Sequence, residues 1–200
     1  MSEDAVRAIR AGHVIILPTD TVYGLCADGY REQPALRLYA LKGRPESMPV
    51  ALLAAELDVV LDAVPEARGR AAAAARALLP GPYTLILPNP GRRFRWLCGA
   101  TPTKIGVRVP VVPPETRAVL DRVGALAATS ANPHGGLDPA RVEDISAELR
   151  GKAAAIVDAG PLPGAPSTVV DLTGPEPVVL REGAVPAVEA LARAREALAG

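Results

Sequence analysis

The chain is poor in several residue types that mark particular classes of protein. Its only aromatic side chains are four Tyr, one Phe and one Trp, which disfavours a surface built for stacking many nucleic-acid bases. The two cysteines, Cys26 and Cys98, and the two histidines form no metal-ligand pattern, and we interpret the cysteines as buried thiols. No apolar run is long enough to span a membrane, and Glu3 and Asp4 do not fit a signal peptide. We therefore expect a cytoplasmic protein without membrane contact.

Acidic residues are missing from one long stretch, although the chain as a whole has 22 basic and 22 acidic residues. None lies between positions 67 and 114, where the chain carries several basic residues: Arg68, Arg70, Arg76, Arg92, Arg93, Arg95, Lys104 and Arg108. A block of this kind suggests a positive surface or cleft that faces an anionic partner, such as nucleotide phosphates or RNA. The alternative is that these cations are scattered over several faces and solvated.

The common nucleotide-binding motifs are also absent. The sequence has neither a Walker loop nor a Gly-x-Gly-x-x-Gly after a strand, and no acidic pair has metal-ligand spacing. We predict no protein metal site. If a nucleotide binds, its phosphates must be held by Lys, Arg and hydroxyl groups, and Mg²⁺ would be bound through those phosphates.

The chain has the composition of a globular protein, with 49% apolar residues and a mean hydropathy of +0.18 over 200 residues. We find no repeat, long linker or boundary, and expect one domain over 1–200. Helices are expected at 3–11, 34–41, 56–63, 66–79, 115–123, 142–150 and 186–198. Strands are expected at 13–17, 23–27, 50–53, 83–87, 105–109, 125–129, 154–158, 167–171 and 178–181. Their irregular alternation favours an α/β domain with a twisted, mixed sheet.

The most informative short stretch is Lys42-Gly43-Arg44-Pro45, which follows an apolar helical pattern. Gly43 is expected to cap the helix, and Pro45 pushes Arg44 toward an extended backbone. Residues two apart in an extended chain point to the same side, so Lys42 and Arg44 could converge on one anion. The alternative is a solvated helix end, where cations are favourable in any case.

Polar side chains follow or lie on several expected strands. Thr21 comes after the first strand and could contact a small polar substrate, or it could cap a local turn together with Asp20. Ser130 and Asn132 follow an apolar strand and can share a face, where they could bind a nucleotide or cap a helix.

One strand has an alternating pattern of its own. Lys104, Gly106 and Arg108 fall on one face, where Gly106 would let a ligand approach. That face could equally point to solvent. Ser167 and Arg181, each considered alone, are only weak indications of a ligand-binding site.

Several stretches taken together resemble the YrdC-like family. The matching blocks are PTDTVYGL at 18–25, LKGRP at 41–45, PGPYTLILP at 80–88, IGVRVP at 105–110, ATSAN at 128–132, STVVDLTG at 167–174 and LREGA at 180–184. The resemblance implies an open, twisted mixed β-sheet with flanking helices and a concave basic cavity. It also implies an enzyme that joins L-threonine, bicarbonate and ATP to give threonylcarbamoyl-AMP and pyrophosphate, for the threonylcarbamoyladenosine modification of tRNA.

The resemblance further implies roles for individual residues. The family signature of Lys-x-Arg and Ser-x-Asn is complete here, in Lys42, Arg44, Ser130 and Asn132. The residues implied as L-threonine contacts are Thr21, Arg108, Ser130 and Ser167. Those implied as ATP contacts are Lys42, Arg44, Met48, Lys104, Asn132 and Arg181. Met48 and Leu53 depart from the family, since many relatives have Asn at the first position and some have His at the second.

Two other interpretations compete with the synthase. The chain could be a YrdC-like RNA-binding module that uses the basic stretch without chemistry, or it could belong to the related YciO-like group. Members of that group tend to lack the complete four-residue signature, so its presence here favours the synthase. In the synthase interpretation tRNA is reached indirectly, through a downstream transferase complex.

Overall fold

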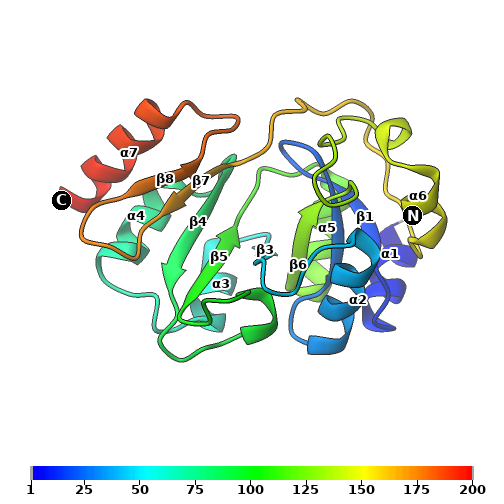
Figure 1. Cartoon of the computed structure of the whole chain (residues 1–200), viewed down its shortest axis with the longest axis horizontal. Coiled ribbons are helices and arrows are strands. Elements are labelled where there is room, and N and C mark those ends of the chain that lie inside the picture. The colour runs from blue at the N-terminus through cyan, green and yellow to red at the C-terminus, as the bar shows by residue number, and fades with distance from the viewer. Residues whose placement is uncertain (1, 200) are drawn as a thin grey trace.

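A computed structural model describes residues 2–199, and eight strands in this range form one mixed sheet (Figure 1). The strands are β1 (Ile15–Pro18), β2 (Tyr23–Asp28), β3 (Ala51–Ala54), β4 (Tyr83–Pro88), β5 (Lys104–Arg108), β6 (Ala125–Ser130), β7 (Thr168–Asp171) and β8 (Val178–Arg181). Their order across the sheet is β1-β2-β6-β3-β5-β4-β7-β8. The pairs β3–β5 and β4–β7 are parallel and the others are antiparallel. The expected open, mixed sheet is therefore confirmed.

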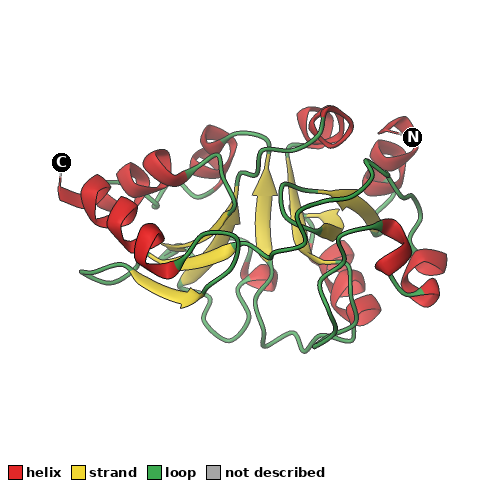
Figure 2. Cartoon of the chain, turned by 90° about the horizontal axis from the view of Figure 1, so that it is seen from above, coloured by secondary structure: helices red, strands yellow, loops and turns green. Residues whose placement is uncertain are grey.

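Helices lie on both sides of the strands (Figure 2). The α-helices are α1 (Ser2–Arg10), α2 (Glu32–Lys42), α3 (Leu57–Ala63), α4 (Arg70–Leu78), α5 (Pro114–Val123), α6 (Ala147–Lys152) and α7 (Ala187–Ala199). Two short 3-10 turns, η1 (Arg95–Leu97) and η2 (Val142–Asp144), complete the described elements. Helix α1 packs with α5 at one end of the sheet and α4 packs with α7 at the other (Figure 1).

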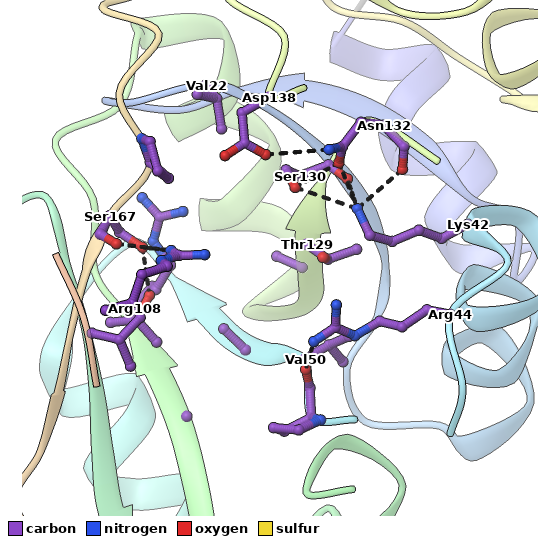
Figure 3. Close-up of a pocket in the computed structure, with 18 of the residues that line it drawn as sticks. Val22, Lys42, Arg44, Val50, Arg108, Thr129, Ser130, Asn132, Asp138 and Ser167 are labelled. Carbon is purple, nitrogen blue, oxygen red and sulfur yellow. Dashed lines mark hydrogen bonds between the residues drawn. The ribbon is translucent and has the colours of Figure 1, made fainter. Parts of the chain in front are cut away.

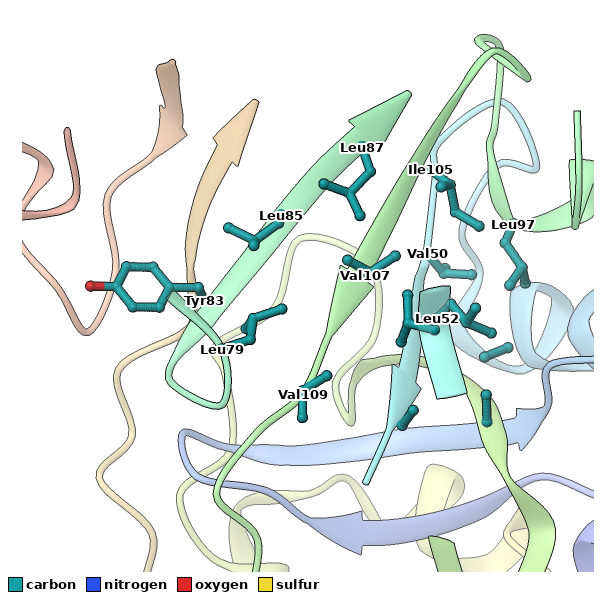
Figure 4. Close-up of a cluster of buried hydrophobic side chains, with 14 of the residues drawn as sticks. Val50, Leu52, Leu79, Tyr83, Leu85, Leu87, Leu97, Ile105, Val107 and Val109 are labelled. Atoms are coloured by element: carbon teal, nitrogen blue, oxygen red, sulfur yellow. The ribbon is translucent and has the colours of Figure 1, made fainter. Parts of the chain in front are cut away.

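The alternation of side chains along the strands divides the interior in two. On β3, Leu52 belongs to the larger core, together with residues of α2, α3, α4 and α7, whereas Leu53 belongs to a smaller core under α1 and α5. Strands β4 and β5 turn Tyr83, Leu85 and Val107 into the larger core (Figure 4). Their alternate residues therefore face the opposite side of the sheet, where a polar cavity lies.

Three sequence expectations were wrong in detail. Residues 154–158 form no strand, because this segment meets β1 through a single bridge between Ile16 and Ile156. The helix expected at 142–150 is divided into η2 and α6, and Ser146 caps α6 by accepting a hydrogen bond from the Leu149 amide. The helix expected at 66–79 begins only at Arg70, after Gly69 with its φ of 59°.

Among residues 2–199, none of the helices combines the length and the apolar character needed to cross a lipid bilayer.

Candidate active site

The cavity has a volume of about 340 Å³ and lies against the face of the sheet opposite the larger core (Figure 3). Small and apolar residues of the strands form part of its wall: Ala51, Ile86, Gly106, Ala128 and Val169. Gly106 lines the cavity between two cationic positions of β5, as the alternation of that strand predicted. Most charged and polar lining residues lie at the last position of an element or in the loop beside it: Lys42, Arg44, Arg108, Ser130, Asn132, Asp138, Ser167 and Arg181.

Lys42 is the last residue of α2, and its side chain is clamped to the end of β6. Gly43 adopts a left-handed conformation with φ of 65°, which ends the helix. The Lys42 Nζ lies 2.6 Å from the Ser130 carbonyl oxygen, 3.0 Å from the Asn132 carbonyl oxygen and 2.6 Å from Asn132 Oδ1. An ammonium group has three hydrogens, so these acceptors occupy its donor capacity. Lys42 therefore holds the 130–132 turn, which differs from the expectation that Lys42 and Arg44 converge on one anion.

Burial changes the acid–base behaviour of this lysine. The side chain of Lys42 is only 4% exposed. Desolvation, reinforced by the positive charge of Arg44, lowers the pKa of Lys42 to about 8. The carboxylate of Asp138 opposes this shift. An anion bound in the cavity would favour the charged form of Lys42 in the same way, so the clamp and ligand binding are electrostatically coupled.

Arg44 and Arg181 have no carboxylate partner among the described residues, and both line the cavity. Arg44 Nη2 donates to the Pro49 carbonyl oxygen at 2.9 Å, while its buried Nε has no hydrogen-bond partner in the described range. Arg181 Nη2 donates to the Ser167 carbonyl oxygen at 2.8 Å. Desolvation lowers the pKa of Arg44, and the charge of Arg181 adds to this shift. A bound anion would relieve both unfavourable effects.

Arg108 lies on the other side of the cavity and is paired (Figure 3). Its Nη2 donates to Asp20 Oδ1 at 2.9 Å and lies 3.1 Å from Thr21 Oγ1. The buried Arg108 Nε has no partner within residues 2–199. Burial raises the pKa of Asp20, and the guanidinium of Arg108 opposes that shift. The sequence offered Asp20 only as part of a local turn cap, whereas the structure pairs it with Arg108 of the cavity lining.

Short hydroxyl and amide side chains line both sides of the cavity. Ser130 Oγ lies 2.7 Å from Asn132 Oδ1, which agrees with the expected shared face. Asn132 Nδ2 lies 3.4 Å from a carboxylate oxygen of Asp138. On the opposite wall, the hydroxyls of Ser167 and Thr84 are 2.7 Å apart. Sequence reasoning missed Thr84 and Asp138. The alternation of β4 could have identified Thr84, because it places that residue on the same face as Ile86.

A close approach of two loops fixes Ser167 and Arg181. A Cβ atom on Gly183 would overlap the Pro166 carbonyl oxygen and lie 2.7 Å from the Ser167 carbonyl carbon. The Gly183 amide also donates to Thr168 Oγ1 at 3.1 Å. Only glycine allows this contact, so Gly183 matters for the shape of the cavity wall.

Three residues implied as substrate contacts do not line the cavity. Thr21 is buried behind the wall, where it contacts Arg108 and Thr19. Lys104 is 42% exposed and pairs with Asp171 at 2.8 Å. Met48 is 37% exposed on the loop after Arg44.

The acid-free stretch does not form one positive surface. Several of its cations pair with carboxylates from other parts of the chain: Arg76 with Asp58, Arg93 with Glu66, Lys104 with Asp171 and Arg108 with Asp20. They lie on different elements, and Arg108 is the member of the stretch that lines the cavity. The stretch therefore follows the second alternative, in which its cations lie on several faces, although the cavity itself is basic.

In the described part of the chain, no group of three or more His, Cys, Asp or Glu side chains gathers. The two cysteines are buried as expected, and burial raises the pKa of Cys26 to about 12 and that of Cys98 to about 11.

The fold and the site define an open α/β domain whose cavity is suited to anionic ligands held by arginines. The family model for Sua5, YciO and YrdC proteins, described as "Telomere recombination", matches residues 7–183. The chain belongs to this family. The threonylcarbamoyl-AMP synthase of Pyrococcus abyssi is 35% identical over 185 residues, which are 90% of this chain and 53% of that relative. The chain thus spans about half the length of this relative.

Solved structures agree with the sequence comparison. The crystal structure of P. abyssi Sua5 complexed with L-threonine matches with a TM-score of 0.84 and 32% identity, over 94% of this chain and 55% of that one. Escherichia coli YciO also matches with a TM-score of 0.84, at 29% identity over 95% of this chain and 92% of that one. The fold alone therefore does not separate the synthases from the YciO group, and the side chains of the cavity must do so.

Proposed function

We propose that the chain is a threonylcarbamoyl-AMP synthase, which joins L-threonine, bicarbonate and ATP and releases pyrophosphate. The observation that carries the proposal is the gathering of Lys42, Arg44, Arg108 and Arg181 around one cavity. Two of these arginines have a buried guanidinium nitrogen without a partner in the described structure, as expected for groups that wait for an anion. The name of the Pyrococcus relative and the L-threonine bound in its structure support the same reaction.

The chemistry explains why several cations are required. The amine of threonine combines with bicarbonate to give a carbamate and water. A carbamate oxygen then attacks the α-phosphorus of ATP, and pyrophosphate leaves with the electrons of the broken P–O bond. Two anions approach one another in this step, so fixed positive charges must lower the repulsion. The ammonium group of threonine must lose one proton to the solvent before the carbamate forms. Because the carbamate already carries a negative charge, its attack on the α-phosphorus needs no general base, and positioning supplies most of the catalysis of that step.

The geometry suggests how the substrates divide the cavity. Arg44 and Arg181 have no carboxylate partner and would hold the ATP phosphates, with Asn132 beside them. Arg108 would hold the threonine carboxylate, since a guanidinium can bind it through two parallel hydrogen bonds.

Hydroxyl groups would complete the threonine subsite. Ser167 and Ser130 line the cavity and offer them, while Thr21 would act through Arg108. Lys42 would contribute to substrate binding by holding the 130–132 turn in place and by adding a positive charge to the cavity. Lys104 and Met48 would reach ATP only from the rim.

Magnesium would enter with ATP and be held mainly by phosphate oxygens. Asp138 is a carboxylate in the cavity lining that could contribute a further oxygen.

We also propose a single domain over 1–200, a cytoplasmic location, and delivery of the product to a transferase complex that modifies tRNA. Direct RNA binding is a weaker candidate, because cations of the acid-free stretch are paired with carboxylates.

The test is pyrophosphate release by the purified chain with ATP, bicarbonate and Mg²⁺, with and without L-threonine. The synthase predicts release that depends on threonine, together with a product in which AMP and the threonylcarbamoyl group are joined. Background ATP hydrolysis that ignores threonine would reject the proposal and favour the YciO-like interpretation. Matched measurements with L-serine and L-valine would show whether the amino acid is selected.

A further inference from the structure

The arginines of the cavity differ in how their charges are compensated. Arg108 forms an ion pair with Asp20 in which both side chains are nearly buried, with exposed fractions of 11% and 10%. Arg44 and Arg181 donate to backbone carbonyl oxygens and have no carboxylate partner among residues 2–199. Arg181 lies within electrostatic range of both others, because its charge contributes to lowering the pKa of Arg44 and that of Arg108. At one side of the cavity, the positive charge of Arg44 therefore has no paired carboxylate. At the other side, the positive charge of Arg108 is balanced by Asp20.

This difference matters for the kind of anion that each side can accept. A phosphate or pyrophosphate group carries about two charges near neutral pH and would meet the carboxylate of Asp20 when it approached Arg108. Free L-threonine, as it first binds, carries one carboxylate charge and a compensating ammonium group, so its repulsion from Asp20 is much smaller.

The hydrogen-bonding capacity at Arg108 fits a carboxylate. Asp20 Oδ1 and Thr21 Oγ1 both accept from Nη2, and the buried Nε has no partner in the described range. The two hydrogens of Nη1 have no hydrogen-bond partner among residues 2–199 and can donate to a carboxylate oxygen. The nearby hydroxyls of Ser167 and Thr84 add neutral donors without adding charge.

We infer that Asp20 is a specificity-determining residue that keeps phosphate groups away from Arg108 and reserves this subsite for the amino-acid carboxylate. The inference rests on the proposed function and deepens it. It gives a reason for an acidic residue beside a cavity that must bind anions. Without Asp20, ATP and the pyrophosphate product would compete for the arginine that holds the amino acid.

The experiment measures L-threonine binding by calorimetry at increasing inorganic phosphate, without nucleotide. In the wild-type protein, phosphate should leave the threonine affinity unchanged, although it competes with ATP. Asp20→Asn keeps an oxygen that can accept from Arg108 and removes the charge. In this variant phosphate should compete with threonine, with phosphate affinity raised by at least about tenfold, as expected when a close like charge is removed from a partly buried anion site.

Two further variants serve as controls. Asp58→Asn also breaks an Asp–Arg pair, with Arg76 at 3.0 Å, but on the exposed surface, and should behave as wild type. Asp20→Asn leaves Arg108 buried without a counter-charge and therefore lowers the stability of the fold, so its folded state is checked by circular dichroism. The double variant Asp20→Asn/Arg108→Gln removes both charges, and should lose threonine binding without gaining phosphate binding.

Three results would overturn the inference. They are competition between phosphate and threonine in the wild-type protein, absence of that competition in a folded Asp20→Asn variant, and normal threonine binding by the double variant. A failure of the proposed function has a different signature: a wild-type protein that does not bind threonine, or that binds it without releasing pyrophosphate from ATP.

Discussion

The buried Lys42 gives a prediction in which stability and function change in opposite directions with pH. Its pKa is about 8 in the folded protein, against 10.5 as the ordinary value. Between these two pH values the unfolded chain binds more protons at this site than the folded protein does, so the free energy of unfolding rises with pH. The difference of about 2.5 pH units between the two pKa values corresponds to about 3 kcal/mol in the free energy of unfolding. The folded protein gains this stability progressively from pH 8 to 10.5 and lacks it below pH 8.

Other groups titrate in the same range, so the prediction is made for the difference between two proteins. Burial raises the pKa of Cys26 to about 12 and that of Cys98 to about 11, both from 9.0, and this makes the folded protein less stable above pH 9. A Lys42→Met variant keeps both thiols. The wild-type free energy of unfolding minus that of the variant should therefore isolate the contribution of Lys42.

The assay is urea unfolding at a series of pH values from 7 to 10, followed by Trp96 fluorescence and extrapolated linearly to water. The matched control is Lys152→Met, since Lys152 is an exposed lysine 2.6 Å from Glu148 and should follow the wild-type pH dependence. In activity, kcat/KM for ATP should fall as pH rises through about 8 in the wild-type protein, because Lys42 loses its charge. Parallel stability curves for wild type and Lys42→Met would refute the argument that this lysine is desolvated.

Three further variants test other parts of the site. Gly183→Ala should push Pro166 out of place, destabilise the protein by about 1–3 kcal/mol in urea unfolding and lower threonine-dependent turnover. Arg44→Met should lower kcat by about 10²–10³-fold with an unchanged melting temperature, whereas Arg76→Met, at an exposed ion pair, should change neither. Lys104→Met should raise KM for ATP by no more than about fivefold, since this half-exposed residue pairs with Asp171 and is not part of the cavity lining. A large kcat loss in Lys104→Met, or none in Arg44→Met, would show that the phosphates bind elsewhere.

Local periodicity predicted much of the site correctly. The alternation of β5 places Gly106 and Arg108 on the cavity face, because successive residues of a strand point to opposite sides. The two-residue spacing likewise brings Ser130 and Asn132 together at the end of β6. These features depend only on neighbours in the sequence.

Features that depend on distant residues were not predictable. The direction of the Lys42 side chain is set by acceptors 88 and 90 positions away, at the end of β6 and in the turn that follows it. The lack of acidic residues between 67 and 114 did not predict a positive surface for the same reason. Arg93 and Arg108 pair with carboxylates that lie outside this stretch of the sequence. The pairing of Asp20 with Arg108 joins residues 88 positions apart.

The central claim is that the basic cavity activates threonine as its carbamate on AMP. It is tested most directly by incubating the protein with ATP, ¹⁴C-bicarbonate and Mg²⁺, with or without L-threonine, and separating the products. The account predicts a labelled adenylate and an equal amount of pyrophosphate, formed only with threonine and lost in Arg44→Met. Pyrophosphate release without threonine, or threonine-dependent release without label in an adenylate, would contradict it.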